Sequence, residues 1–234
     1  MVAIAAPQLP PSRVERFSRV APSWILRAAE DGLKEAEAAG SGWAGSPPPL
    51  TGASATERAV RDAMPRADRL QISAPFRINA ASALFSAVVL TAPDPAADTT
   101  PSTATADAAP RPATGSTDPA DDGSLELREV MNLSSAARVT VLSDGAATAM
   151  RESAATIQVL EWGWLAAGVP SVIVARWSAP PPARDRLMAE LHKRLQAGES
   201  PSAALAAAQR AVRETPGMSA PINWAGWVLA GASR

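Results

Sequence analysis

The sequence contains no cysteine and only one histidine, His192. The lack of cysteine excludes disulfides, thiolate metal ligands and a cysteine nucleophile. A single imidazole also excludes metal sites that are built from several histidines. These two absences remove thiol chemistry and histidine-rich metal chemistry from the functions open to the chain.

An excess of charge of one sign is also missing, because 22 basic residues face 23 acidic ones and the formal net charge is −1. This balance offers no electrostatic attraction to nucleic acid or to an anionic membrane, so neither is an expected partner. The most apolar window, Trp162–Ala175, is shorter than the roughly 20 residues of a membrane span. The beginning of the chain lacks the basic leader of a signal peptide. We expect a soluble cytoplasmic protein.

Glycine-rich phosphate-binding motifs are absent as well. The stretch SDGAAT lacks the lysine and the spacing of a P-loop, and no GxGxxG follows a predicted strand. The sequence therefore predicts no nucleotide cofactor, and with the missing ligands above it predicts no metal.

What is present is an alternation of strands and helices in a chain that is 47% hydrophobic. Short β-branched runs alternate with segments of helical periodicity, which favours an α/β fold with a mostly parallel sheet and helices on both faces. The predicted strands are Val2–Ala6, Arg69–Ser73, Ser86–Thr91, Val139–Ser143, Ser171–Trp177 and Trp224–Gly231. The predicted helices are Arg13–Phe17, Trp24–Ala39, Thr56–Met64, one through Met150 and Trp164, one from the Pro180–Pro182 run to Gly198, and one that begins at Ser200 and Pro201.

One segment, Ala92–Gly123, differs from the rest of the chain. It has six prolines and six acidic residues but no leucine, isoleucine, valine or aromatic residue. Such a composition cannot bury enough apolar surface to offset the entropy of ordering. We predict a disordered insertion between two strands of a single domain that spans residues 1–234.

The strand Val139–Ser143 ends in Ser143, Asp144 and Gly145, and small polar residues at the carboxyl end of a buried strand often carry function in α/β proteins. Asp144 could act as a carboxylate acid or base, or it could begin an Asp-Gly turn. Ser143 could be a nucleophile only with a base beside it. Both the chemical and the structural interpretation stay open from the residues alone.

His192 and three tryptophans are further candidates. His192 follows Leu191 in a predicted helix, and we expect it to be a partly solvated helix residue rather than a catalytic base. Trp177, Trp224 and Trp227 could form an aromatic binding platform, but core packing is the expected role.

Several motifs occur in an order that resembles a known family. The stretches AAGVPSVIVARW, RLMAELHKRLQAGESPSAALAAAQRAV and APINWAGWVLAG closely resemble the end of CHAT domains, which are caspase-like domains. Upstream, ADRLQISAPFRIN and DGSLELREVMNLSSAARVTVLSDGAAT resemble the two strands of that family that carry its active site. The resemblance implies a caspase-like three-layer sandwich.

Active members of that family are cysteine peptidases with a His–Cys dyad at the ends of these two strands. Carried over position by position, Pro75 stands where the histidine is expected and Gly145 stands where the cysteine is expected. The resemblance therefore implies a pseudopeptidase without catalytic residues.

We expect this pseudopeptidase to act as a protein-binding, regulatory or scaffold module. Its partner would be a protein, either a repeat protein or another effector. A vestigial cleft at Ser73, Ser143, Asp144 and Gly145 is the expected binding site. Two alternatives are a hydrolase that uses Ser143 and Asp144, or Ser73, in the same cleft and a decayed domain that is only a structural part of an assembly.

Overall fold

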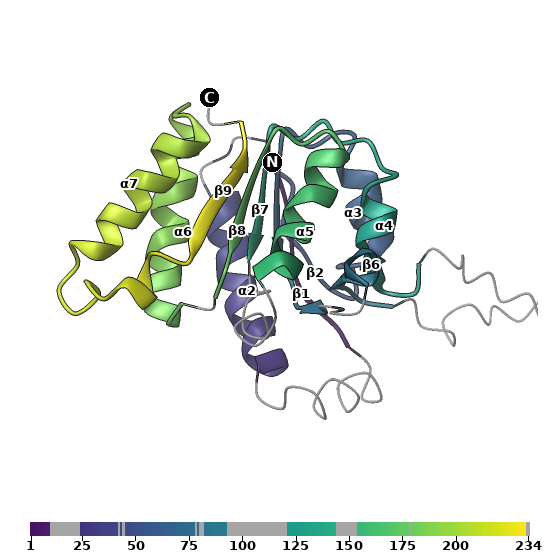
Figure 1. Ribbon diagram of the computed structural model, residues 1–234, viewed down its shortest axis with the longest axis horizontal. Helices are drawn as coiled ribbons and strands as arrows, with labels where there is room; N and C mark the ends of the chain where they lie inside the picture. The colour runs from purple at the N-terminus through teal and green to yellow at the C-terminus, as the bar shows by residue number, and fades with distance from the viewer. Residues whose placement is uncertain are drawn as a thin grey trace, which may run out of the picture.

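A computed structural model of the protein describes residues 1–9, 24–41, 43, 45–77, 79, 82–92, 121–143, 154–177 and 179–232, without the side chains of 24–31 and 154–159. Its main sheet has six strands in the order β2-β1-β3-β7-β8-β9 (Figure 1). They are β1 (Val2–Pro7), β2 (Leu50–Gly52), β3 (Arg69–Ser73), β7 (Val139–Ser143), β8 (Ser171–Ala175) and β9 (Trp227–Gly231). Neighbouring strands are parallel except for β8 and β9, which are antiparallel.

Helices cover both faces of this sheet, as the sequence predicts (Figure 1). One face packs against α2 (Trp24–Gly40) and α6 (Pro181–Gln196), and α7 (Pro201–Arg213) lies beside α6. The other face packs against α3 (Glu57–Ala63) and α5 (Ala154–Ala166). The result is a mixed α/β fold of three layers, and it agrees with the caspase-like arrangement that the resemblance implies.

The two faces of the sheet follow from the period of two in a strand. Leu70 and Ile72 of β3 belong to the apolar cluster under α3 and α5. On the opposite face, Val139 and Val141 of β7 pack against α6 and α7. Every residue of β7 and β8 is buried, which explains why these strands read as continuous apolar or small-residue runs.

A second, three-stranded antiparallel sheet consists of β4 (Phe76–Arg77), β5 (Ala87–Val89) and β6 (Ser124–Glu126). Beside it lie the short helices η1 (Ala83–Phe85) and α4 (Leu127–Val130). In this region the sequence predicts only the strand that corresponds to β5. Strands of two or three residues are too short to show an alternating pattern, so periodicity could not identify the others.

Several predicted boundaries are confirmed. Strands β3 and β7 have the predicted limits, and Ser200 caps α7 by accepting a hydrogen bond from the Ala203 amide (3.4 Å). The predicted strand Trp224–Gly231 begins three residues too early, because residues 224–226 form a turn between the short helix η3 (Pro221–Asn223) and β9. The predicted helix Arg13–Phe17 lies outside the described residues, and so does most of the Ala92–Gly123 insertion.

The tryptophans pack as expected. Trp227 is 2% exposed and belongs to the core between the sheet, α6 and α7. Trp177 and Trp224 are partly buried against the same core.

Candidate functional site

The carboxyl ends of β3 and β7 lie next to each other at one edge of the sheet. The two strands are parallel, and Ser73 is paired with Ser143 in the strand register. Two of the residues predicted for the vestigial cleft are therefore neighbours. The other two, Asp144 and Gly145, lie outside the described residues.

Pro75 follows β3 and is buried. Its carbonyl accepts a hydrogen bond from the amide of Val89 (2.7 Å), so this segment is held by β5. Proline has no side-chain group that can accept or donate a proton, and it has no backbone N–H. Pro75, which the resemblance assigns to the position of the family histidine, therefore cannot perform acid–base chemistry.

A buried carboxylate, Glu35 of α2, joins the two strand ends. The hydroxyl of Ser73 donates to Glu35 Oε2 (2.8 Å), and the hydroxyl of Ser143 donates to the same oxygen. Both serines are 0% exposed and Glu35 is 1% exposed. Each hydroxyl is thus already hydrogen bonded and out of contact with solvent.

Arg184 of α6 faces Glu35 from the other helix. Its Nε lies 2.6 Å from Glu35 Oε1, and the arginine is only 3% exposed. Burial raises the pKa of Glu35, while the charge of Arg184 and the hydrogen bonds from Ser143 and Ser73 oppose that rise. The pair ties α2 and α6 together over the sheet, because a buried charge of either sign needs its counterpart.

Gln71 and His192 extend these contacts across the same face. The amide Nε2 of Gln71 donates to Ser73 Oγ (2.7 Å), and its Oε1 lies 3.1 Å from His192 Nε2. We name the six residues the buried polar network: Glu35, Gln71, Ser73, Ser143, Arg184 and His192.

The expectation that His192 is partly solvated is wrong, because the residue is 2% exposed. Its ring packs between α6 and the sheet, where Gln71 provides a polar partner that the helix sequence alone does not reveal. Burial and, to a lesser extent, the charge of Arg69 lower the pKa of His192 to about 4. The imidazole is therefore neutral at physiological pH and far from the solvent that a catalytic base must reach.

Glu35 and Arg184 are not among the site residues that the sequence predicts. A Cβ added to Gly32 would lie 2.7 Å from the Ser73 carbonyl oxygen, so only glycine lets α2 approach β3 this closely. The small residues Gly32, Ala36 and Ala39 recur at helical spacing and are buried. That stripe includes the position of Glu35, and it is the signal that could have placed this carboxylate inside the protein.

The chemistry available at these strand ends is limited. The hydroxyls of the buried polar network bond inward to Glu35, and they offer no exposed oxygen to a substrate. Within the described ranges, no group of three histidine, cysteine, aspartate or glutamate side chains could hold a metal ion. In the same part of the chain, no helix is both long and apolar enough to cross a membrane.

A known protein family matches nearly the whole chain, and its fold agrees with the one observed. The CHAT domain family matches residues 2–232. The chain belongs to this family. A CHAT domain whose sequence contains no cysteine lacks the cysteine of the family dyad, whatever the conformation around Gly145.

Two curated proteins show more distant similarity to this CHAT domain. Tetratricopeptide repeat protein 28 of Mus musculus is 31% identical over 108 residues, and that of Homo sapiens is 30% identical over 108 residues. The aligned segment covers 46% of this chain but only 4% of either relative. The chain thus resembles a small part of much longer proteins.

Proposed function

We propose that this CHAT domain is a pseudopeptidase that acts by binding another protein. The observation that carries the proposal is the absence of cysteine from a chain that belongs to the CHAT family. The resemblance also assigns Pro75, which is buried, to the position of the family histidine. The only imidazole, His192, is enclosed in the buried polar network.

A hydrolase that uses Ser143 or Ser73 has no support in the described site. A serine nucleophile must expose its oxygen to the substrate and pass its proton to a base. Ser143 and Ser73 are fully buried, and the carboxylate that accepts their hydrogen bonds is itself paired with Arg184. These groups have the burial and pairing typical of residues that hold a core together.

A protein partner fits the family context. The two curated relatives are named as tetratricopeptide repeat proteins, so a segment similar to this chain occurs in proteins with repeats. This supports a repeat protein or another effector as the partner of the domain. A purely structural part of an assembly would need no such partner.

Turnover of a pooled fluorogenic peptide library by the purified chain tests the proposal. We expect no turnover above buffer for the wild type or for Ser143→Ala, with Ser202→Ala as the matched surface control. A double variant, Pro75→His with Gly145→Cys, tests whether peptide turnover appears when both dyad residues are introduced. Wild-type turnover that persists with Ser202→Ala and is lost with Ser143→Ala would overturn the proposal.

A further inference from the structure

Strand β9 stands at the end of the strand order and forms one edge of the main sheet (Figure 1). The amide of Arg176 donates to the Gly226 carbonyl (2.7 Å), and the amide of Ala232 donates to the Pro170 carbonyl (2.6 Å). In an antiparallel pair, every second residue bonds to the neighbouring strand, and the residues between them point their backbone groups away from it. Since residues 226 and 232 bond toward β8, the backbone groups of every second residue from 227 to 231 point outward.

Leu229 lies at the centre of this open edge. Within the described residues, neither its outward N–H nor its outward C=O has a hydrogen-bond partner. The carbonyl of Trp227 also points outward, in agreement with the hydrogen bond that it accepts from Gln209 Nε2 of α7 (2.9 Å). Strand β9 contains no proline and no charged residue, and these are the residues that usually protect a sheet edge. Leu229 therefore offers a donor and an acceptor to another strand.

The opposite edge of the main sheet, β2, differs from β9. It has only three residues. The hydroxyl of Ser54 accepts a hydrogen bond from the Thr51 amide (3.0 Å) and donates to the Thr51 carbonyl (2.8 Å). The Gly52 carbonyl accepts a hydrogen bond from the Ala55 amide (3.1 Å). These backbone groups of β2 bond within their own turn, so β9 is the edge that can accept another strand.

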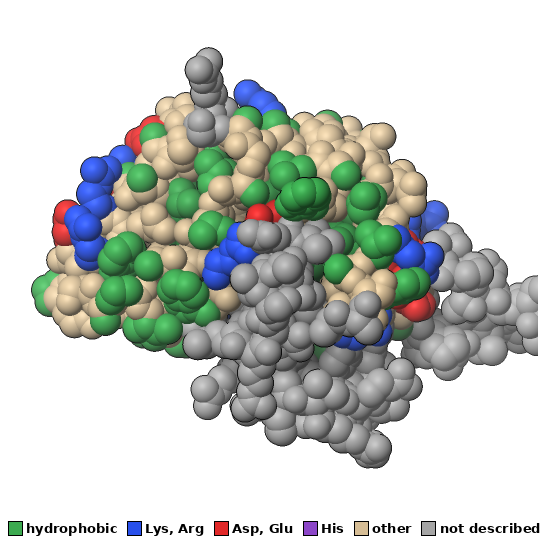
Figure 2. All heavy atoms as spheres, viewed as in Figure 1, with side chains coloured by type: hydrophobic (Ala, Val, Ile, Leu, Met, Phe, Trp, Pro, Cys, Tyr) green, Lys and Arg blue, Asp and Glu red, His purple; other side chains and the backbone are tan. Residues whose placement is uncertain are grey.

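Apolar side chains flank β9 on both faces of the sheet. On the α5 face, a Cβ on Gly231 would lie 2.7 Å from Leu165 Cδ2, and Trp162 precedes Leu165 by one turn on the same face of the helix. On the α7 face, Trp177 lies against the residue before β9, because a Cβ on Gly226 would overlap its ring. Figure 2, in the same view as Figure 1, shows hydrophobic side chains at the surface on both sides of β9. A strand added beside β9 would lie between these two apolar layers.

We propose that β9 binds an extended segment of a protein partner, which pairs with Leu229 and becomes a seventh strand of the main sheet. This inference rests on the proposed function and names the surface that performs it. An extended backbone is the group that presents N–H and C=O at the spacing of a strand edge. Because apolar layers cover both faces of the sheet, a segment with apolar residues at successive positions fits this edge.

A second copy of the chain fits this edge less well. In a two-fold antiparallel pair of β9 strands, every register with two bonded positions uses either the Trp227 carbonyl or Gly231 of both copies. Gln209 already bonds to the Trp227 carbonyl, and Gly231 has a φ of +92°, so the extended conformation ends there. Two copies would meet these limits on both strands, whereas a separate segment meets them on one.

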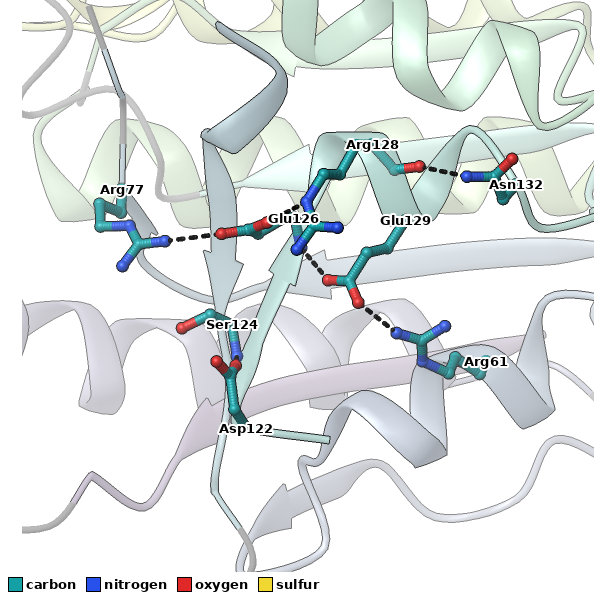
Figure 3. A network of polar contacts seen from close by, with 8 residues as sticks. All are labelled: Arg61, Arg77, Asp122, Ser124, Glu126, Arg128, Glu129 and Asn132. Carbon is teal, nitrogen blue, oxygen red and sulfur yellow. Dashed lines mark hydrogen bonds and ion pairs between the residues drawn. The ribbon is translucent and has the colours of Figure 1, made fainter. Parts of the chain in front are cut away.

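The surface around η1 and α4 is less selective than β9. There, Arg77 and Arg128 pair with Glu126, and Arg61 pairs with Glu129 (Figure 3). Because these charges are engaged with one another, none of them selects a ligand.

Fluorescence polarisation with two labelled peptides tests the proposal. Both peptides have valine and leucine at their central positions and a lysine at each end, and one of them carries a methyl group on every central amide nitrogen. We expect the unmethylated peptide to bind the full chain. The methylated peptide should bind about tenfold more weakly or less, because it lacks the backbone donors that pair with β9.

Leu229→Pro and Leu229→Ala form a matched pair of variants. Both shorten the side chain, but only proline removes the outward N–H. Leu229→Pro should bind the unmethylated peptide about tenfold more weakly than Leu229→Ala. Its urea midpoint should stay near that of Leu229→Ala, whereas Ala230→Pro should lower the midpoint, because the Ala230 amide points to β8. Phe85→Ala removes an exposed aromatic ring of η1 and should bind like the wild type.

Equal affinity of the wild type for the two peptides, no binding of the unmethylated peptide at millimolar concentration, or equal binding by the two Leu229 variants would overturn the proposal. Dimers in analytical ultracentrifugation that Leu229→Pro abolishes and Leu229→Ala retains would assign the edge to a second copy and would also overturn it. If Leu229→Pro does not fold, the two peptides with the wild type still decide. These results leave the pseudopeptidase proposal standing, since that proposal fails only through peptide turnover.

Discussion

Glu35 and Trp162 lie on opposite sides of the main sheet, and each has the exposure that its residue type usually avoids. Glu35 is buried between α2, α6 and the strand ends, where serine hydroxyls and Arg184 surround its carboxylate. Trp162 of α5 is 69% exposed to solvent.

The two regions differ in the groups that they expose to solvent. At the strand ends where the resemblance places the active site, the described hydroxyls are occupied by internal hydrogen bonds. The α5 side keeps large apolar groups at the surface. Changes at the first region should therefore reduce stability, whereas Trp162→Ala should change the free energy of unfolding little.

The largest expected effect comes from the buried carboxylate. Glu35→Gln removes the charge that faces Arg184 and should reduce the free energy of unfolding by about 3–5 kcal/mol. Urea denaturation measures this, with Glu37→Gln on the exposed face of the same helix as the control. A loss as small as that of the control would mean that the ion pair does not hold α2 to α6.

The next effect is a dependence of stability on pH through His192. Its folded-state pKa of about 4 lies below the ordinary value of 6.5, so the unfolded chain takes up a proton first as the pH falls. Stability should therefore decrease between pH 6.5 and pH 4, by roughly 3 kcal/mol from this residue. Denaturation at several pH values measures it, and His192→Gln should lose this contribution. An unchanged pH profile in the variant would show that His192 is accessible in the folded protein.

A smaller effect is expected at the contact between α2 and β3. Gly32→Ala places a Cβ against the Ser73 carbonyl and should cost about 1–3 kcal/mol, the usual range for overpacking a core. Gly40→Ala on the same helix meets nothing within 4 Å and is the matched control. Thermal denaturation compares the two, and equal melting temperatures would contradict the close approach of α2.

Glu57, at the start of α3, should give the opposite pH dependence to His192. Burial, and then the charges of Glu129 and Asp122, raise the pKa of Glu57 to about 8. The folded state then holds a proton that the unfolded state releases above pH 4.5, so stability should decrease as the pH rises from 4.5 to 8. Glu57→Gln should flatten that part of the profile in thermal denaturation. A steeper decrease in the variant would contradict the burial of this carboxyl group.

Much of this fold could be predicted from the sequence, because long apolar strands and amphipathic helices have clear periods. Strands β3 and β7 were located to the residue, and so the neighbouring positions of Ser73 and Ser143 followed. The resemblance to CHAT domains assigns Pro75 and Gly145 to the two dyad positions, and this assignment stays a prediction.

The buried polar network and the exposure of Trp162 could not be predicted in this way. Glu35 and Arg184 come from helices about 150 residues apart in the chain, and only the packing of α2 beside α6 pairs them. Trp162 occurs in an apolar helix, α5, where periodicity alone suggests burial. The structure instead leaves it 69% exposed.

The most direct test measures turnover of the pooled peptide library by the wild type, Ser143→Ala and Ser202→Ala, with both variants shown to be folded by circular dichroism. We expect no turnover above buffer for any of the three, because the chain has no cysteine and the Ser143 side chain is buried. Turnover by the wild type and by Ser202→Ala that Ser143→Ala abolishes would place catalysis at the strand ends and contradict the account.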